Sequence, residues 1–227
     1  MNHAIILAGG VGSRMNADVP KQYIPVKGVP LFVYSVRKFS SRKDIDTIVI
    51  VASDDWKEFI KESLLSESIS QSVVYASAGR SRQHSVWNGL QALHTIASER
   101  DLVFVHDSVR PLFPLSIIDD CIETCTEYDA ALPVISVKDA TYRSADGVEL
   151  TAILPRTELF SGQSPECFRY GPFVRAHSMI PGDEIAFVRG CSELVFRAGM
   201  KVRLVPGTEQ NFKITTKEDL QAFALLV

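Results

Sequence analysis

Along the chain, short apolar segments alternate with longer segments in which apolar and polar residues are mixed. Short runs rich in Ile and Val, with no polar residue at every second place, predict strands that are covered on both faces, as in a parallel sheet. Between them lie longer runs with apolar residues at helical spacing, as at Phe32, Val33, Val36 and Phe39. This alternation predicts an α/β fold with a doubly wound, mostly parallel sheet, whose ligand lies at the carboxyl ends of the strands.

The same pattern gives the expected bounds of the elements. The expected strands cover residues 4–8, 47–51, 73–75, 102–106, 130–135 and 201–205. The expected helices cover a run around 32–39, then 55–65, 82–96, 115–128 and 184–198, and a last helix from 216 onward. Thr215 or Thr216 would cap this last helix, and Glu218 and Asp219 in its first turn suit the helix dipole.

The alternation stops between Val137 and Phe168. Asp146-Gly147 is a hairpin turn signal, and short strands are expected on either side of it, over 138–143 and 149–154. We therefore expect one domain over residues 1–227 with a β-arm inserted at about 137–160. Because such an arm has little core of its own, it favours a dimer contact.

Composition narrows the class of protein. The chain has 227 residues, 46% of them apolar, which suits a globular protein with one large domain. Its formal net charge of −3 argues against general binding of nucleic acid, and no apolar stretch reaches the roughly twenty residues of a membrane span. The cysteines lack the spacing of a metal knuckle and are interpreted as packed, reduced thiols, which indicates a cytoplasmic location. They are Cys121, Cys125, Cys167 and Cys191.

The first stretch with candidate chemistry follows the opening strand. The run Leu7-Ala8-Gly9-Gly10-Val11-Gly12-Ser13-Arg14-Met15 is followed by Pro20-Lys21-Gln22-Tyr23. Glycines bring backbone amides close to an anion, and Arg14 and Lys21 add two cations, so the stretch predicts a loop that binds a polyphosphate. The alternative is a tight glycine turn with solvated charges.

Two familiar glycine motifs are excluded for this loop. A P-loop would need Gly-Lys followed by Ser or Thr, whereas Gly12 is followed by Ser13-Arg14. The dinucleotide fingerprint would need a third glycine where Met15 stands.

The second stretch is Gly79-Arg80-Ser81-Arg82-Gln83-His84-Ser85-Val86, between a short strand and a long helix. Hydroxyl and guanidinium groups at a helix N-terminus supply donors for a base edge or a phosphate. By itself the stretch would equally suit a capping segment with exposed arginines.

The third stretch is His106-Asp107-Ser108-Val109-Arg110-Pro111, at the end of an apolar strand. An aspartate at the carboxyl end of a central strand is well placed to hold Mg²⁺ on a nucleotide, so Asp107 is the metal candidate. His106 fits a structural hydrogen-bonding role better than that of a general base. Arg110 suits either a phosphate contact or a brace to a carboxylate.

The fourth stretch is Asn211-Phe212-Lys213-Ile214-Thr215-Thr216, just before the last helix. A lysine between two apolar residues at a helix start fits two interpretations equally, a solvated charge or a group that returns to the phosphate site.

Together and in this order, the four stretches resemble the cytidylyltransferases that act on small polyol phosphates, and the resemblance covers essentially the whole chain. The glycine-rich loop alone would indicate only a nucleotidyltransferase. The resemblance is narrowed from nucleotidyltransferases in general to these cytidylyltransferases by Pro20-Lys21-Gln22-Tyr23 and the three later stretches. The resemblance implies a Rossmann-like nucleotidyltransferase fold that joins CTP and a polyol phosphate to give a CDP-polyol and pyrophosphate, with Mg²⁺ and a homodimer.

The resemblance also implies roles for individual residues. Arg14, Lys21 and Lys213 would be catalytic, stabilising the charge on the reacting phosphate and on the leaving pyrophosphate, and Asp107 would hold the metal. The nucleotide pocket would comprise Leu7, Ala8, Gly9, Gly10, Gly12, Gly79, Arg82 and Ser85. The acceptor would contact Arg110, Thr141, Arg156 and Ser164, of which Arg156 would come from the β-arm of the partner subunit.

The acceptor side departs from the enzymes that use methylerythritol phosphate. Gly162-Gln163-Ser164-Pro165-Glu166 replaces their usual Gln or Leu, Thr, Pro and Gln, and Arg189-Gly190-Cys191-Ser192 stands where they carry a Thr-Asp pair. A pocket that loses a carboxylate and gains an arginine should bind a different polyol, or bind the same polyol differently. We therefore expect ribitol 5-phosphate, for CDP-ribitol in a surface polymer, ahead of 2-C-methyl-D-erythritol 4-phosphate for isoprenoid synthesis. The alternative to an enzyme is a protein of another functional class, a noncatalytic nucleotide-binding module.

Overall fold

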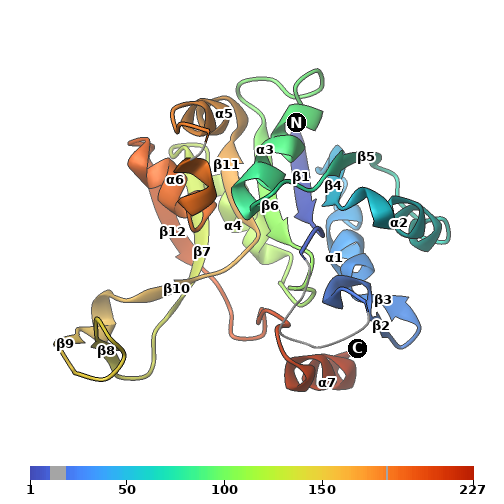
Figure 1. Cartoon of the computed structure of the whole chain (residues 1–227). Coiled ribbons are helices and arrows are strands. Elements are labelled where there is room, and N and C mark those ends of the chain that lie inside the picture. The colour runs from blue at the N-terminus through green and yellow to red at the C-terminus, as the bar shows by residue number, and fades with distance from the viewer. Residues whose placement is uncertain (11–18, 183) are drawn as a thin grey trace.

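The computed structural model describes residues 1–10, 19–182 and 184–227. Its centre is an eight-stranded sheet in the order β10-β7-β11-β6-β1-β4-β5, with β12 paired to β7 (Figure 1). The strands are β1 (Asn2–Leu7), β4 (Thr47–Ala52), β5 (Ser72–Ser77), β6 (Leu102–Asp107), β7 (Ala130–Ser136), β10 (Phe160–Gly162), β11 (Glu166–Arg169) and β12 (Val202–Pro206).

The sheet is mostly parallel, as predicted. β1 pairs in parallel with both β4 and β6, and β4 pairs in parallel with β5. The exceptions are β11, which lies antiparallel between β6 and β7, and β10, which pairs antiparallel with β7. The carboxyl ends of β1 and β6 are therefore neighbours, with Leu7 opposite Asp107.

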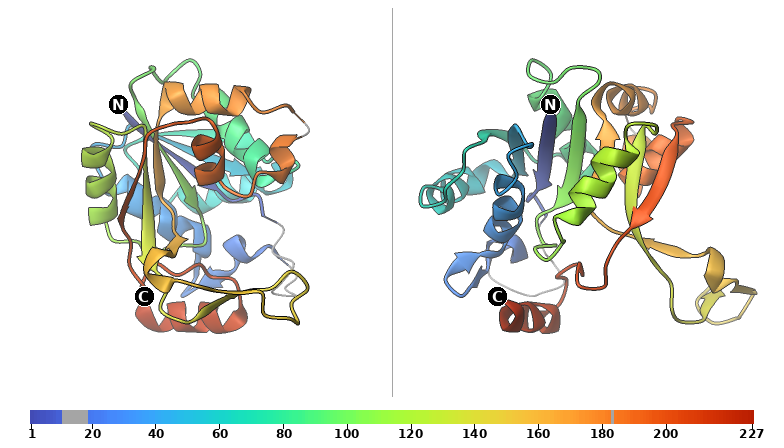
Figure 2. Two further views of the ribbon diagram at one scale, coloured as in Figure 1. Left: turned by 90° about the vertical axis from the view of Figure 1, so that its left-hand side faces the viewer. Right: turned by 180° about the vertical axis from the view of Figure 1, so that it is seen from behind.

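Helices cover both faces of this sheet, which gives three layers (Figure 2). One face carries α1 (Leu31–Ser40), α2 (Lys57–Leu64) and α4 (Ser116–Thr124). The other face carries α3 (Arg82–Ala92), α5 (Tyr170–Ser178) and α6 (Cys191–Arg197). A last helix, α7 (Lys217–Leu226), packs through Phe223 on a small separate cluster with Leu31, Val109 and Ile214.

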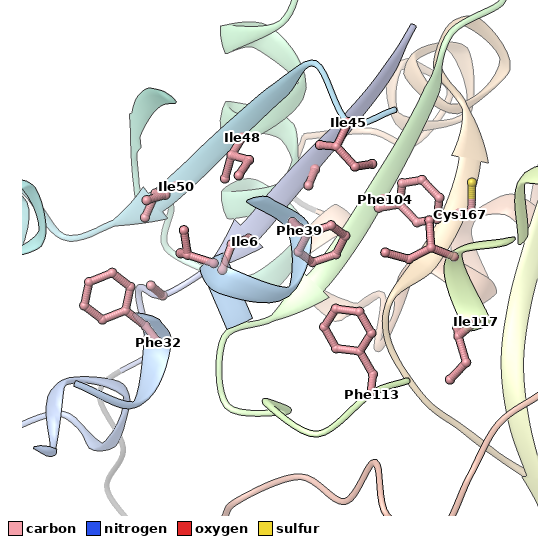
Figure 3. Close-up of a cluster of buried hydrophobic side chains, with 14 of the residues drawn as sticks. Ile6, Phe32, Phe39, Ile45, Ile48, Ile50, Phe104, Phe113, Ile117 and Cys167 are labelled. Atoms are coloured by element: carbon pink, nitrogen blue, oxygen red, sulfur yellow. The ribbon is translucent and has the colours of Figure 1, made fainter. Parts of the chain in front are cut away.

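Alternation along each strand divides its side chains between the two layers. Figure 3 shows Ile6, Ile48 and Phe104 from neighbouring strands facing Phe39 of α1. Their neighbours in sequence, such as Ile5, face α3 on the other side. Because both faces are buried, the strands need no polar residue at every second place, and complete burial of each large apolar side chain contributes about 1.5–3 kcal/mol.

The hairpin predicted at Asp146-Gly147 is present. β8 (Thr141–Arg143) pairs antiparallel with β9 (Ala152–Leu154) in a two-stranded sheet of its own. Gly147 has a φ of 77°, which favours glycine, and the carboxylate of Asp146 accepts hydrogen bonds from two backbone N–H groups of the turn. Both Figure 1 and Figure 2 show this arm extending away from the central sheet.

Some expected elements differ from the structure. The helix expected over 184–198 is two helices, a 3-10 helix (Glu184–Phe187) and α6, because the backbone at Gly190 is extended with a φ of −160°. The helices expected over 82–96 and 115–128 end earlier, at Ala92 and Thr124. The expected helix over 55–65 opens with a 3-10 turn (Asp54–Trp56) before α2 begins.

Other elements were not expected from the sequence. β11 has only four residues, and β10 only three. α5 begins Tyr170-Gly171-Pro172, which resembles a turn, but proline is tolerated in the first turn of a helix because those N–H groups have no partner within the helix. A short hairpin of β2 (Pro25–Val26) and β3 (Val29–Pro30) precedes α1. In the part of the chain that the structure describes, no helix has both the length and the apolar character needed to cross a membrane.

Candidate active site

A cavity of about 440 Å³ lies at the carboxyl ends of β1 and β6. Four segments far apart in the sequence line it, and all four belong to the stretches that carry the predicted chemistry. The lining residues are Leu7, Gly9, Gly10, Lys21, Gln22, Gly79, Arg80, Ser81, Arg82, Ser85, Asp107, Ser108, Val109, Lys213 and Thr215.

The cavity brings together cations from both ends of the chain. The ammonium of Lys21 donates a hydrogen bond of 2.9 Å to the carbonyl oxygen of Ile214, next to Lys213. The ammonium of Lys213 lies 2.7 Å from Asp107 Oδ2. The two lysines therefore face one space, as the predicted catalytic roles require. Gly12 and Arg14 lie outside the described residues.

Asp107 is the centre of the charges in this cavity. Besides Lys213, it faces Arg82 at 3.4 Å and Arg110 at 3.9 Å. Burial raises the pKa of Asp107, but the positive charges of Arg82 and Lys213 outweigh burial and hold the pKa well below its usual range. Asp107 is therefore ionised at neutral pH and available to a cation.

Among the described residues that line the cavity, Asp107, the metal candidate, is the one acidic residue. Within the described residues, no group of three His, Cys, Asp or Glu side chains forms a metal cluster. A hard cation such as Mg²⁺ commonly binds one or two carboxylates together with phosphate oxygens of a substrate. The single carboxylate of Asp107 on the cavity wall suits that kind of shared site.

Arg82 lies at the start of α3 and lines the cavity. Its guanidinium donates a hydrogen bond of 3.2 Å to the Sγ atom of Cys191 and lies 3.5 Å from the carboxylate of Glu166. Burial lowers the pKa of Arg82, yet Cys191, Asp107 and Glu166 together raise it above its ordinary value. Arg82 is therefore a fixed positive charge.

Two glycines allow the loops around the cavity to approach closely. A side chain at Gly9 would overlap Ala78, and one at Gly79 would overlap His84 in the first turn of α3. The N–H of Gly79 donates a 3.0 Å hydrogen bond to the hydroxyl of Ser85, which fixes this loop against the helix.

The loop after β1 is held by the residues that follow Lys21. Gln22 Nε2 donates hydrogen bonds to the carbonyl oxygens of Ala8 and Gly10, at 2.6 and 2.7 Å, and the Tyr23 hydroxyl donates to the same Ala8 oxygen. Ala8 itself does not line the cavity. These bonds hold the carbonyl oxygen of Ala8, and contact of Ala8 with a nucleotide stays a prediction.

Ser164 and Arg110, predicted to contact the acceptor, brace the segment around Asp107. The Ser164 hydroxyl accepts a 3.1 Å hydrogen bond from the N–H of Asp107 and lies 3.2 Å from Nδ1 of the buried His106. Arg110 donates a 2.7 Å bond to the carbonyl oxygen of Asn211. Neither side chain lines the cavity. Contact of either residue with an acceptor stays a prediction.

Thr141 and Arg156 lie on the β-arm and do not line the cavity of their own chain. Thr141 donates a 3.4 Å bond to the carbonyl oxygen of Asp139, and Arg156 donates one of 3.2 Å to that of Lys138. Both contacts are local to the arm.

Some lining residues had no individually predicted role in binding or catalysis. Gln22, Arg80, Ser81, Ser108, Val109 and Thr215 line the cavity. Each lies within one of the four stretches, so its position in the sequence was the available signal. Glu166 lies 3.5 Å from Arg82, and its only signal in the sequence is its place in the run Ser164-Pro165-Glu166.

The whole chain matches known proteins. The family model described as 2-C-methyl-D-erythritol 4-phosphate cytidylyltransferase matches residues 2–227. A protein of that name from Clostridium novyi is 36% identical over 220 residues, which cover 96% of this chain and 93% of that protein. One from Geobacillus thermodenitrificans is 34% identical and covers 97% of this chain and 94% of its own length.

Solved structures give the same result. The 4-diphosphocytidyl-2C-methyl-D-erythritol synthase of Anaerococcus prevotii is 26% identical, with a TM-score of 0.82 over 100% of this chain and 97% of its own. The Francisella tularensis 2-C-methyl-D-erythritol 4-phosphate cytidylyltransferase shares the fold, with a TM-score of 0.84 at 24% identity over 100% of this chain and 99% of its own.

These matches confirm the predicted fold and the predicted class of enzyme, a cytidylyltransferase. They do not support the order of the two acceptors, because the family model and these relatives are named for methylerythritol phosphate and not for ribitol phosphate. The differences at residues 162–166 and 189–192 occur in a chain that still matches the methylerythritol phosphate family over residues 2–227. The chain belongs to the 2-C-methyl-D-erythritol 4-phosphate cytidylyltransferase family.

Proposed function

We propose that this enzyme transfers CMP from CTP to 2-C-methyl-D-erythritol 4-phosphate and releases pyrophosphate. The observation that carries the proposal is that Lys21 and Lys213, 192 positions apart in sequence, line the same cavity as Asp107, with which Lys213 forms an ion pair. Membership of the family supports the choice of acceptor.

In the proposed reaction, a phosphate oxygen of the acceptor attacks the α-phosphorus of CTP. The bond from that phosphorus to the oxygen bridging it to the β-phosphate breaks, and its electron pair leaves with pyrophosphate. The attacking phosphate is already anionic, so the enzyme needs positive charge more than a base. Lys21 and Lys213 would supply this charge, and Arg14 is expected to join them.

Asp107 is the group that would hold the expected Mg²⁺, since it is ionised and borders the cavity. When bound by Asp107, Mg²⁺ would supply positive charge that neutralises the phosphates of CTP. The ammonium of Lys213, which lies 2.7 Å from Asp107, would add a second positive charge for the reacting phosphate.

The nucleotide would lie along the loops after β1 and before α3. Leu7, Gly9 and Gly10 border the cavity from the first loop, while Gly79, Arg82 and Ser85 border it from the second. The close approach at Gly9 and Gly79 gives backbone groups access to the ligand. These residues would bind the cytosine, the ribose and the phosphates of CTP.

The binding site for the acceptor would be completed by a second subunit. The β-arm extends from the sheet (Figure 1). Arg156 and Thr141 lie on this arm and do not line the cavity of their own chain. The arm's side chains Tyr142 and Ile153 are 62% and 68% exposed, which suits a covered surface in a homodimer. In that dimer, Arg156 would reach the acceptor phosphate in the partner's cavity.

The proposal is tested by measuring pyrophosphate release from CTP and Mg²⁺ with a panel of acceptors. We expect 2-C-methyl-D-erythritol 4-phosphate to be used more than tenfold faster than ribitol 5-phosphate, since tenfold corresponds to about 1.4 kcal/mol, roughly the net contribution of one to two hydrogen bonds. Faster turnover of ribitol 5-phosphate would contradict the proposed acceptor. Binding of CTP without pyrophosphate release, across the whole panel, would instead indicate a noncatalytic nucleotide-binding module.

A further inference from the structure

Glu166 is a carboxylate close to the cavity for which the proposed reaction has no role. It begins β11, where it lies opposite Val105 of the antiparallel neighbour β6. Asp107 is two residues beyond Val105, so the side chains of Glu166 and Asp107 lie on the same face of the sheet. That face carries α3 and its first residue, Arg82.

Asp107 and Glu166 share one guanidinium nitrogen. NH2 of Arg82 lies 3.4 Å from Asp107 Oδ1 and 3.5 Å from Glu166 Oε2. The other terminal nitrogen of Arg82 donates to the Sγ atom of Cys191. Arg82 is thus held from three sides, by strands β6 and β11 and by helix α6.

The two carboxylates differ in their access to a ligand. Asp107 and Arg82 line the cavity, whereas Glu166 does not, and its side chain is only 12% exposed. Oδ1 of Asp107 faces Arg82, so a ligand or metal bound to this carboxylate would weaken its attraction for the guanidinium. The contact between Glu166 and Arg82 lies behind the cavity wall, so it persists when the cavity is filled.

We propose that Glu166 is a positioning residue, which keeps Arg82 on the cavity wall when CTP and its metal draw Asp107 away from the guanidinium. This inference rests on the proposed function, because CTP is the ligand that engages Asp107. Without Glu166, Arg82 would lose one carboxylate permanently and the other on binding. Its guanidinium would then be free to leave the orientation that the nucleotide needs.

The test is calorimetric titration of CTP, in the presence of Mg²⁺, into the full chain and its variants. Glu166→Gln keeps the size and removes the charge, and we expect the Kd for CTP to rise about tenfold, the order expected for loss of one charge-assisted contact. Glu67→Gln is the matched control. It breaks an ion pair of 2.7 Å with Arg37 of α1, which does not border the cavity, and should leave the Kd unchanged.

A second background separates positioning from a general effect on the fold. In an Arg82→Met chain, Glu166→Gln should change the Kd by less than twofold, because no guanidinium is left to position. Glu166→Asp keeps the charge and should weaken binding less than Glu166→Gln.

Two results would overturn the inference. One is a Kd for Glu166→Gln within twofold of the wild type, and the other is an undiminished tenfold loss in the Arg82→Met background. If the wild-type chain itself does not bind CTP, the proposed function fails, and the inference fails with it.

Discussion

Replacing Lys213 with alanine tests the chemistry most directly. The ammonium lies 2.7 Å from Asp107 on the cavity wall, where it can reach a bound triphosphate. A unit charge about 4 Å from the reacting phosphate contributes about 4 kcal/mol at an effective dielectric constant near 20. Removal of one such preorganised group commonly lowers kcat by about 10²–10³. We expect a loss of kcat in that range.

The effect on folding should be small. Lys213 has 36% of its side chain exposed, and the partly buried Asp107 keeps Arg82 and Arg110 as partners, so no carboxylate is left unpaired when the ammonium is removed. The assay is steady-state pyrophosphate release at saturating CTP, with thermal unfolding alongside. Lys217→Ala, an exposed lysine four residues later, is the control. A Lys213→Ala enzyme with kcat within threefold of the wild type would refute the reasoning.

Three further predictions address pH, packing and the second subunit. Burial lowers the pKa of His177 to about 4, so the unfolded chain binds a proton more readily than the folded chain between about pH 6.5 and 4, and the free energy of unfolding falls by up to about 3 kcal/mol across that window. His177→Leu should therefore unfold at a higher urea concentration than the wild type at pH 4.5. Equal urea midpoints would contradict this. Phe39→Ala should lower the free energy of unfolding by about 3–5 kcal/mol, because the side chain is fully buried, and a loss below 1 kcal/mol in chemical denaturation would show that the cluster collapses around the gap. Random mixing of Arg156→Ala and Lys213→Ala subunits should restore about a quarter of the wild-type rate, because half of the dimers are mixed and each mixed dimer has one of its two sites intact. No recovery of activity would place Arg156 outside the partner's site.

The parts of the fold that follow from the sequence are those with repeated local signals. The runs that became β1, β4 and β6 are apolar throughout, and such runs read as strands wherever both faces are covered. β11 carries no such signal, because it has four residues and its antiparallel pairing depends on where the arm returns the chain. The break at Gly190 was missed because the flanking apolar residues keep helical spacing across it.

The candidate site was predictable to the level of segments but not of contacts. The carboxyl ends of parallel strands meet at one edge, so the stretches after β1 and β6 were expected to lie together. Nothing local indicates that Lys213 would pair with Asp107, since 106 residues separate them. A brace to a carboxylate was one of the two roles expected of Arg110, and Arg110 lies 3.9 Å from Asp107. The contact of Ser164 with the N–H of Asp107 depends on a side-chain direction, which spacing along the sequence does not encode.

The bond between Lys21 and the carbonyl oxygen of Ile214 has a consequence for how the enzyme comes into being. Seven strands of the sheet precede residue 170, and all eight precede residue 207, yet the cavity is closed by a segment that follows them. During synthesis, a nascent chain can complete its central layers while this cavity still lacks one wall. The wall that carries Lys213 can form only after residues 207–215 have been added and have docked against Lys21.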